Sequence, residues 1–262
     1  MGTPNPASTY NQSTDKLLSI LELLCVTGQP MRLNEISSKL NFNSSTALRF
    51  LNSLQRNGYV YKDLDSNKYR MTYKICGLAS YVSNSAEIIN IASGPIRSLS
   101  YSLGECVCLA ISQSYQVVYV YVCDGPKRIL QSTQRIGKIA PMHATGVGKV
   151  LLTDFSDQEI DEMIAERGLT WYTENTITSK DQLLKELQII KKQGYGFDNQ
   201  ECDLGARCIA LPIRDYTDHI IASMSVTGPA EAMTDDFYKV HFDEIKRTAD
   251  EISARLGYQQ KK

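Results

Sequence analysis

The stretch from Tyr195 to Pro212 reads YGFDNQECDLGARCIALP. Its second half begins at Ala206 and is a short apolar run that ends at a proline, which predicts a buried strand. Its first half is acidic, polar and interrupted by glycine, so a polar loop leads directly into the core. Acidic side chains at the mouth of a buried strand that contains a cysteine predict a small-molecule pocket with a polar rim and a soft apolar wall. The alternative is an ordinary hairpin on a core strand.

A second stretch of similar character, Gly137 to Lys149, reads GKIAPMHATGVGK, and apolar residues continue it as a helix to Leu152. A histidine, a threonine and two glycines at the start of this helix would present free backbone N–H groups to an anion. The nucleotide P-loop is excluded, because its G-x-x-x-x-G-K-[ST] spacing is missing and Val150 follows the lysine. The alternative is that Gly146 and Gly148 only permit close packing.

Length and composition describe an ordinary globular protein with room for two domains. The chain has 262 residues, of which 42% are hydrophobic and 22% charged. No apolar run approaches the ~18–20 residues of a membrane helix, and the polar N-terminus is unlike a secretory signal, so we expect a cytoplasmic protein with no membrane partner. Seven scattered cysteines without a C-x-x-C pair are typical of reduced core thiols rather than of a disulfide framework or a zinc site.

The charges are distributed unevenly along the chain. Residues 1–75 hold nine basic and five acidic side chains, a net charge of +4, so the remainder, with 19 basic and 24 acidic side chains, carries −5. A basic N-terminal piece joined to an acidic larger piece indicates that the first piece meets a polyanion.

The N-terminal piece has the pattern of a winged helix-turn-helix domain over residues 14–74, after a disordered tail at 1–13. Ser13 or Thr14 is expected to cap the first helix, the second follows Leu33, and the third runs from Ser44 to Asn57. The apolar face of the third helix is expected to hold Ala47, Leu48, Leu51 and Leu54. Two alternating segments, 59–62 and 68–71, then predict a hairpin.

In a winged helix the third helix enters the major groove of DNA, and its N-terminal side chains reach base edges and phosphates. Hydroxyl groups near a helix N-terminus suit phosphate, and Arg49 is the best candidate for reading guanine. The alternative is that Ser44 is only an N-cap and the basic residues are solvated surface. The whole pattern favours DNA binding. The expected DNA-binding residues are Ser44, Ser45, Thr46, Arg49, Arg56, Lys62, Lys68 and Arg70.

The rest of the chain predicts a linker helix at 75–85 and an α+β effector-binding domain at 86–262. A helix from Glu87 to Leu103 is expected to be broken or bent near Gly94-Pro95. The expected strands are Cys106–Ser112, Val117–Cys123, Arg128–Thr133, Ala206–Ile213 and Ile220–Val226. The expected later helices are Ser156–Arg167, Ser179–Gln193 and Thr234–Leu256. Ser225 and Thr227 are two residues apart and should point to the same side of the sheet.

Four motifs of this sequence together resemble the IclR family of bacterial transcription regulators: PMHATGVGK at 141–149, GYGFD at 194–198 with Glu201, GARCIA at 205–210 and SVTGP at 225–229. The resemblance spans the chain from about Ser13 to Tyr258. It implies an N-terminal winged helix, a dimerising linker helix and a GAF-like effector domain with a central antiparallel sheet. It also implies a dimer or a dimer of dimers on a palindromic operator in double-stranded DNA.

The resemblance further implies an effector pocket and a class of ligand. The pocket residues carried over are Gly146 and Val147 through their amides, Asp198, Cys208, Ser225 and Thr227; His143 joins them from the second stretch. The family often has serine where Thr227 stands, so this chain keeps the hydroxyl group and adds a methyl group beside it. Family effectors are often small carboxylates, and the small side chains of Ser132, Ala140 and Ala206 indicate a roomy pocket. Residues 172–179 resemble the branch that senses 2-keto-3-deoxygluconate, so we expect a sugar acid.

Two other classes of function compete with a regulator. Cys208, His143 and Asp198 could form a nucleophilic set that acts on a small acid, and Ser225 could replace the cysteine as nucleophile. Cys208, however, lies in a run that predicts full burial, and no neighbour in sequence would lower its pKa, so we expect no enzyme. A metal site from His143, Cys202 or Asp198 is a further alternative; the expected protein has neither metal nor cofactor.

Overall fold

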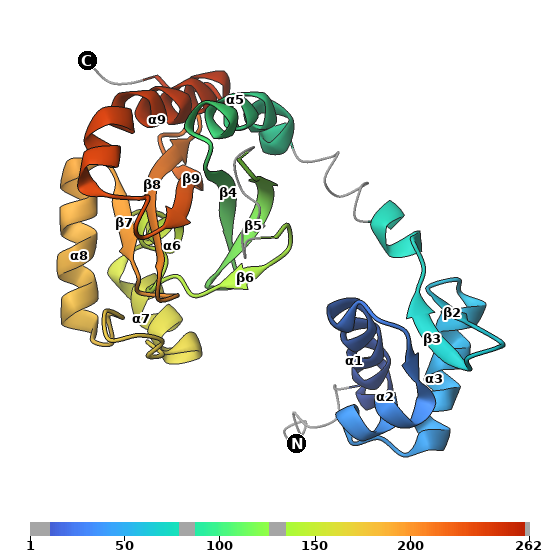
Figure 1. The fold of residues 1–262 in the computed structure, drawn as a ribbon. Helices are drawn as coiled ribbons and strands as arrows, with labels where there is room; N and C mark the ends of the chain where they lie inside the picture. The colour runs from blue at the N-terminus through green and yellow to red at the C-terminus, as the bar shows by residue number, and fades with distance from the viewer. Residues whose placement is uncertain (1–10, 79–86, 126–134, 260–262) are drawn as a thin grey trace. The chain divides into compact units, whose positions relative to one another are not determined.

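A computed structural model describes residues 11–78, 87–125 and 135–259 of the chain. The chain divides into two units, Met1–Ser85 and Ala86–Lys262, which are described separately (Figure 1). Residues 74–78 form a helical turn at the start of the expected linker helix, whose remainder lies outside the described residues. The expected strand Arg128–Thr133 and the wall residue Ser132 also lie outside them.

The N-terminal unit is a winged helix-turn-helix. Its helices are α1 (Gln12–Thr27), α2 (Leu33–Leu40) and α3 (Ser44–Arg56), and its strands β1 (Met31–Arg32), β2 (Val60–Lys62) and β3 (Lys68–Met71) pair antiparallel in the order β1-β3-β2. Helix α1 begins earlier than expected because the Asn11 side chain accepts hydrogen bonds from the Ser13 and Thr14 amides. Neither of these residues is therefore the cap, and residues 12 and 13 belong to the helix rather than to a tail.

One side of α3 packs into the core of this unit, but not the side expected at every position. Ala47, Phe50, Leu51 and Leu54 are buried, whereas Leu48 is 38% exposed. The expectation for Leu48 was wrong because the buried stripe is centred on Leu51, where Phe50 and Leu54 complete it at helical spacing. The opposite side of α3 is therefore free to present polar and basic side chains.

The C-terminal unit is built on one antiparallel sheet of six described strands, which confirms the expected α+β class. The strands run in the order β6-β5-β4-β9-β8-β7, and every recorded pair is antiparallel. Their bounds are β4 (Cys106–Gln113), β5 (Gln116–Cys123), β6 (Ile139–Ala140), β7 (Gly196–Asn199), β8 (Ala206–Arg214) and β9 (Ile220–Pro229).

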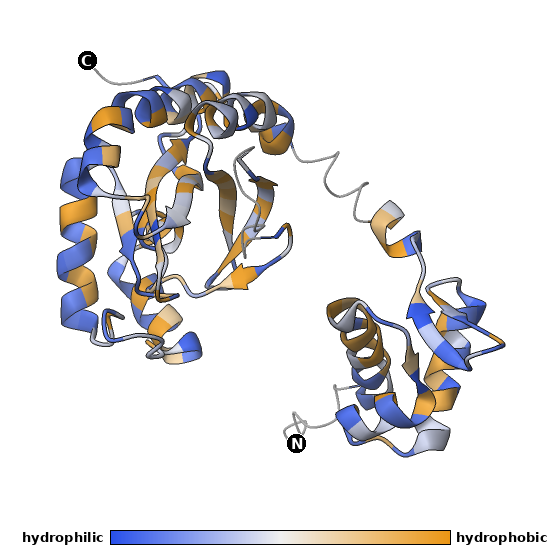
Figure 2. Cartoon of the chain, in the orientation of Figure 1, coloured by the Kyte–Doolittle hydropathy of each residue, from blue (hydrophilic) through white to orange (hydrophobic). Residues whose placement is uncertain are grey.

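Helices cover both faces of this sheet and create two cores (Figures 1 and 2). Helices α5 (Glu87–Leu103) and α9 (Asp235–Arg255) pack on one face. Helices α6 (Gly146–Leu152), α7 (Asp157–Arg167) and α8 (Lys180–Gln193) pack on the other. Helix α5 is continuous through Pro95 rather than broken there, and it ends where the Gly104 amide donates to the Ser100 carbonyl. None of the described helices is both long and apolar enough to cross a membrane.

Candidate functional site

A lateral row of side chains crosses four strands of the C-terminal sheet. The register places Asp198 opposite Cys208, Cys208 opposite Thr227, and Thr227 opposite Cys106. Residues in register on neighbouring strands point to the same face of a sheet. The row faces the core that α6, α7 and α8 cover, because Cys106 belongs to that core. Segments far apart in the chain thus bring a carboxyl, a hydroxyl and thiol groups side by side.

A cavity of about 320 Å³ lies at this row, within the size range of small-molecule pockets. We call it the Asp198 cavity. Its wall holds three of the residues expected to bind the effector, Asp198, Cys208 and Thr227, and eleven further residues, among them the expected small side chains of Ala140 and Ala206. The eleven are Tyr119, Lys138, Ile139, Ala140, Pro141, Thr145, Tyr172, Cys202, Asp203, Ala206 and Arg207.

The remaining four residues expected at the effector site lie near the Asp198 cavity without lining it. Ser225 is buried on β9, opposite Cys108 and Ala210. Gly146 and Val147 open α6 and are buried. The Gly146 backbone lies against Cys208: burial raises the pKa of that thiol, and the Gly146 backbone acts in the opposite direction.

Close packing accounts for both glycines of the α6 motif. A Cβ added to Gly146 would lie 2.8 Å from Cys208 Sγ, and one added to Gly148 would lie 2.3 Å from the Met142 carbonyl oxygen. Thr145 caps α6, since its hydroxyl accepts from the Gly148 amide at 3.2 Å and donates to the Pro141 carbonyl at 2.7 Å. The motif therefore fixes the wall of the Asp198 cavity at Thr145.

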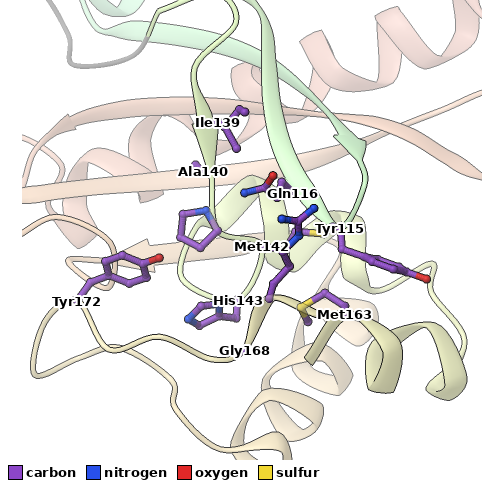
Figure 3. Close-up of a pocket in the computed structure, with 11 residues that line it drawn as sticks. Tyr115, Gln116, Ile139, Ala140, Met142, His143, Met163, Gly168 and Tyr172 are labelled. Carbon is purple, nitrogen blue, oxygen red and sulfur yellow. The ribbon is translucent and has the colours of Figure 1, made fainter. Parts of the chain in front are cut away.

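His143 lies on a neighbouring cavity of about 200 Å³, the His143 cavity. Figure 3 shows the labelled side chains of His143, Met142 and Met163 near one another, with Tyr172 and Tyr115 at opposite ends of the group. The imidazole is buried, its Nε2 lies 3.0 Å from the Thr170 carbonyl oxygen, and burial lowers its pKa, so the ring is neutral at pH 7. Residues 139–141 and Tyr172 line both cavities and separate them.

Burial controls the ionisation of the Asp198 carboxyl. Burial raises its pKa to about 7, although Oδ1 accepts a hydrogen bond of 2.7 Å from the Glu201 amide, which favours the charged form. The Glu201 carboxylate raises the pKa further and Lys149 lowers it. Asp198 is therefore poised between acid and carboxylate near neutral pH, so it can donate or accept a hydrogen bond.

The thiols at this site are unsuited to nucleophilic chemistry. Burial raises the pKa of Cys208 and that of Cys202 to about 12, so both remain thiols at pH 7. Asp198 and Cys208 are neighbours, but His143 belongs to the other cavity, so the Cys-His-acid set is not assembled. Within the described ranges, His143, Cys202 and Asp198 do not form a group of three possible metal ligands.

Beside the Asp198 cavity, a buried ion network holds the loop between β7 and β8. The Lys149 side chain is 1% exposed, and its Nζ lies 2.6 Å from Glu201 Oε1 and 3.1 Å from Glu186 Oε1. Burial alone would lower the pKa of Lys149, but the two carboxylates raise it above its usual value. The hydroxyl of Thr176 donates to the Glu201 carbonyl at 2.7 Å and ties the 172–179 segment to the same loop.

Several residues of the Asp198 cavity were absent from the set expected from the sequence. Tyr119, Lys138, Cys202, Asp203 and Arg207 come from three different segments. Cys202, Asp203 and Arg207 belong to the stretch that predicted the pocket, so their proximity to Asp198 was a usable signal. Lys138 belongs to the second stretch quoted from the sequence, Gly137 to Lys149. Tyr119 carried no signal, because only the pairing of β5 with the sheet brings it to this place.

The eight residues expected to contact DNA lie on α3 and on the wing strands β2 and β3, all exposed or half-buried. Asn43 caps α3 by accepting from the Ser45 amide at 3.1 Å and its hydroxyl at 2.9 Å, so the alternative that Ser44 is the cap is wrong. The five cations of this set, Arg49, Arg56, Lys62, Lys68 and Arg70, form no ion pair with another described residue.

Comparison with known proteins matches both units of the chain. The profile of the bacterial transcriptional regulator IclR C-terminal domain matches residues 80–254, and that of the IclR helix-turn-helix domain matches residues 13–64. The HTH-type transcriptional regulator KdgR of Escherichia coli (strain K12) is 30% identical over 248 residues, which cover 94% of this chain and 94% of that protein. The HTH-type transcriptional repressor AllR of the same strain is 28% identical over 246 residues, covering 94% and 90%.

Solved structures show the same fold. The crystal structure of the Thermotoga maritima IclR has a TM-score of 0.79 and 29% identity and covers 94% of this chain and 99% of that one. An IclR homologue from Microbacterium hydrocarbonoxydans, solved in complex with 4-hydroxybenzoate, has a TM-score of 0.79 at 20% identity and covers 94% and 99%. Transcriptional regulation, and not catalysis, is the function of the family that both profiles define. This chain belongs to the IclR family and is a ligand-responsive, DNA-binding transcriptional regulator.

Proposed function

We propose that the protein represses a carbohydrate or sugar-acid catabolic operon and releases its operator when a small carboxylate occupies the Asp198 cavity. The cavity itself is the main support. It combines a titratable carboxyl at Asp198, the hydroxyl of Thr227 and the cations Lys138 and Arg207 around about 320 Å³. Small acids with several oxygen atoms match such a wall, because each oxygen finds a donor or an acceptor.

The choice of a sugar acid rests on the Tyr172–Ser179 segment and on the small wall side chains. Tyr172 lines the cavity, and Ala140 and Ala206 leave room beside it. The 30% identity with KdgR over 94% of both chains supports the branch that the segment resembles. We therefore name 2-keto-3-deoxygluconate as the first effector to try.

DNA binding is assigned to Ser44, Ser45, Thr46 and Arg49 on α3, with Arg56 and the wing cations Lys62, Lys68 and Arg70. Their exposure and the absence of ion partners among the described residues leave the positive charge available to phosphates. We propose that two copies, or two pairs of copies, bind a palindromic operator, so that the symmetry of the protein matches that of the site. A protein with this role works in the bacterial cytoplasm.

Ligand-induced stabilisation of the intact protein tests the effector site. Unfolding temperatures are measured with a panel of keto, sugar and aromatic acids, for wild type and for Asp198→Ala. An acid that binds the folded state raises the unfolding temperature, by an amount that grows with its concentration over Kd. We expect at least one sugar acid to stabilise wild type and to lose its effect with Asp198→Ala. A stabilisation that Asp198→Ala leaves unchanged would move the effector site elsewhere.

A gel-shift experiment separates the regulatory part of the proposal from the effector site. The upstream region of the regulator's own gene cluster serves as probe, with and without the stabilising acid. We expect the protein to form a complex with the DNA probe, and the acid to dissociate that complex. A complex that the acid strengthens would make the protein an activator or a corepressor-dependent repressor.

A further inference from the structure

Tyr119 is a buried aromatic residue whose side chain lines the Asp198 cavity. It lies on β5, and only 3% of its surface is exposed. Hydrogen bonds to the segment just before β6 hold the Tyr119 backbone in place. Its amide donates to the Lys138 carbonyl at 3.1 Å, and its carbonyl accepts from the Gly137 amide at 2.8 Å. The phenol is therefore held at a defined place in the wall.

A β-bulge directs the phenol into the cavity. In a regular strand Tyr119 and Tyr121 would share a face, because they are two residues apart. The register between β4 and β5 shifts between Leu109 and Ala110, which pair with Tyr121 and Tyr119. As a result Tyr119 packs with the core under α6 and α8, whereas Tyr121 packs with the core under α5 and α9. Bulges commonly redirect one side chain in this way next to binding sites.

The Tyr119 hydroxyl is a neutral donor without a partner in the part of the chain that the structure describes. Burial raises its pKa well above the usual value, and the neighbouring Cys208, Cys108 and Cys202 raise it further. The hydroxyl is not one of the fully buried atoms without a hydrogen bond, which in the described residues are Glu201 Oε2, Arg207 Nε and Tyr238 OH, so it faces the cavity, where a ligand oxygen can accept its hydrogen bond. The cavity wall therefore offers a ligand one neutral hydrogen-bond donor at Tyr119.

The charged groups of the wall favour a second, acidic end on the same ligand. Lys138 and Arg207 line the cavity together with Tyr119, and both are half-buried. The Arg207 guanidinium already donates to the Met233 carbonyl at 2.8 Å and to Asp235 Oδ1 at 3.1 Å. The Lys138 ammonium is in no ion pair with another described residue, which makes it the more available cation for a carboxylate.

We propose that the Tyr119 hydroxyl binds the effector directly and selects acids that carry a hydroxyl or keto oxygen distant from the carboxylate. This inference rests on the proposed function, because it takes the Asp198 cavity as the effector site. The phenol donates to the distal oxygen of the ligand, and the carboxylate lies toward Lys138. Acids that have the same carboxylate end but lack the distal oxygen leave the phenol without this hydrogen bond and bind more weakly.

Calorimetric titration of the full-length protein tests the selection with two matched pairs of probes. The first pair is 2-keto-3-deoxygluconate and pyruvate, and the second is 4-hydroxybenzoate and benzoate. Within the pair that binds, wild type should favour the member with the distal oxygen by about tenfold, the scale of one buried hydrogen bond. Tyr119→Phe should weaken the favoured member about tenfold and leave the binding of the other member unchanged. Tyr121→Phe, on the opposite face of the same strand, should behave as wild type.

Each other outcome overturns the inference. A preference that Tyr119→Phe leaves undiminished, an equal loss with Tyr121→Phe, or a wild type that binds both members equally would remove Tyr119 from the recognition of the ligand. A wild type that binds none of the four acids would overturn the assigned ligand class. The preference of wild type within a pair is measured without any variant, so the inference can be tested even if the Tyr119→Phe protein folds poorly. Gel shifts on the same preparations show separately whether the protein binds DNA. A failure of the proposed regulatory function can therefore be told apart from a failure of the role inferred for Tyr119.

Discussion

The Asp198 carboxyl is buried among groups of both signs, and its protonation should be visible in the stability of the protein. Glu201 and Lys149 act on it from the β7–β8 loop and α6, and the thiols of Cys202 and Cys208 adjoin it. Its pKa is about 7 in the folded protein, against a usual value near 3.8. The folded state therefore holds a proton that the unfolded state releases above about pH 4.

Asp198→Asn should accordingly become more stable relative to wild type as the pH rises. A raised carboxyl pKa contributes stability that is complete below the unfolded pKa and is lost as the pH rises to the folded one. The difference in unfolding free energy should grow by up to about 1.4 kcal/mol per unit between pH 5 and 7 and level off above pH 8. Urea unfolding at pH 5, 6, 7 and 8 measures it. A constant difference across this range would show that Asp198 ionises normally.

Lys149 illustrates how a buried charge acts at the residue scale. Lys149→Met would leave the Glu201 carboxylate buried without its cation, so we expect a loss of about 3–5 kcal/mol in unfolding free energy. Lys180→Met is the matched control, because the Lys180–Asp161 pair is exposed at the surface and should leave stability close to that of wild type. Urea titrations of both variants compare them. Equal effects would mean that the Lys149 network is not a buried structural feature.

At the scale of elements, the short helix α6 depends on glycine for its approach to the chain before it. Gly148→Ala would place a Cβ 2.3 Å from the Met142 carbonyl oxygen and 2.4 Å from its Cα, so the backbone must shift. We expect a loss of about 1–3 kcal/mol. Gly77→Ala is the control: nothing lies within 4 Å of its added Cβ, so stability should stay the same or rise slightly. Thermal unfolding shows the contrast, and an unaffected Gly148→Ala protein would contradict the packing described.

Helix α3 carries the expected base-reading residue, which makes a second prediction at this scale. Arg49 is exposed on the side of α3 opposite Leu51 and Leu54, and its guanidinium lies 5.1 Å from the centre of the Phe50 ring. Sites selected from a random DNA pool by wild type and by Arg49→Ala should differ at one base pair of each half-site, with a loss of about 1–3 kcal/mol there. Identical selected sites would assign base reading to another residue.

Sequence periodicity predicted the elements better than it predicted which side chains meet. The winged helix, the antiparallel sheet and the helices expected at Ser156–Arg167, Ser179–Gln193 and Thr234–Leu256 follow from local patterns that the structure confirms to within a residue at each end. Asp198, Cys208 and Thr227 also lie together, because each belongs to a recognisable motif on one of three neighbouring strands and the register places them opposite one another. Tyr119 could not be predicted, because a one-residue bulge decides which face it takes, and a bulge has no clear signal in a single sequence.

At the scale of the whole molecule, two units of opposite charge make DNA binding a local property of a nearly neutral chain. The chain has a formal net charge of −1, but residues 1–75 hold nine basic against five acidic side chains. If Arg49 reads a base and the other four cations of α3 and the wing contact phosphates, the logarithm of DNA affinity should fall against the logarithm of salt concentration with a slope of about −3 to −4 per protomer. Fluorescence anisotropy on labelled duplex DNA at several salt concentrations measures it. A flat dependence would contradict the assigned DNA surface.

The contact between Gly146 and Cys208 has a consequence for evolution. A methyl group at position 146 would come within 2.8 Å of the sulfur, and a bulkier residue at position 208 would press on the same backbone. Neither position can therefore enlarge alone without distorting the wall of the Asp198 cavity. Among descendants of this sequence, gain of a side chain at 146 should be accompanied by shrinkage at 208 to glycine or alanine, and such paired substitutions would mark lineages whose effector has changed size.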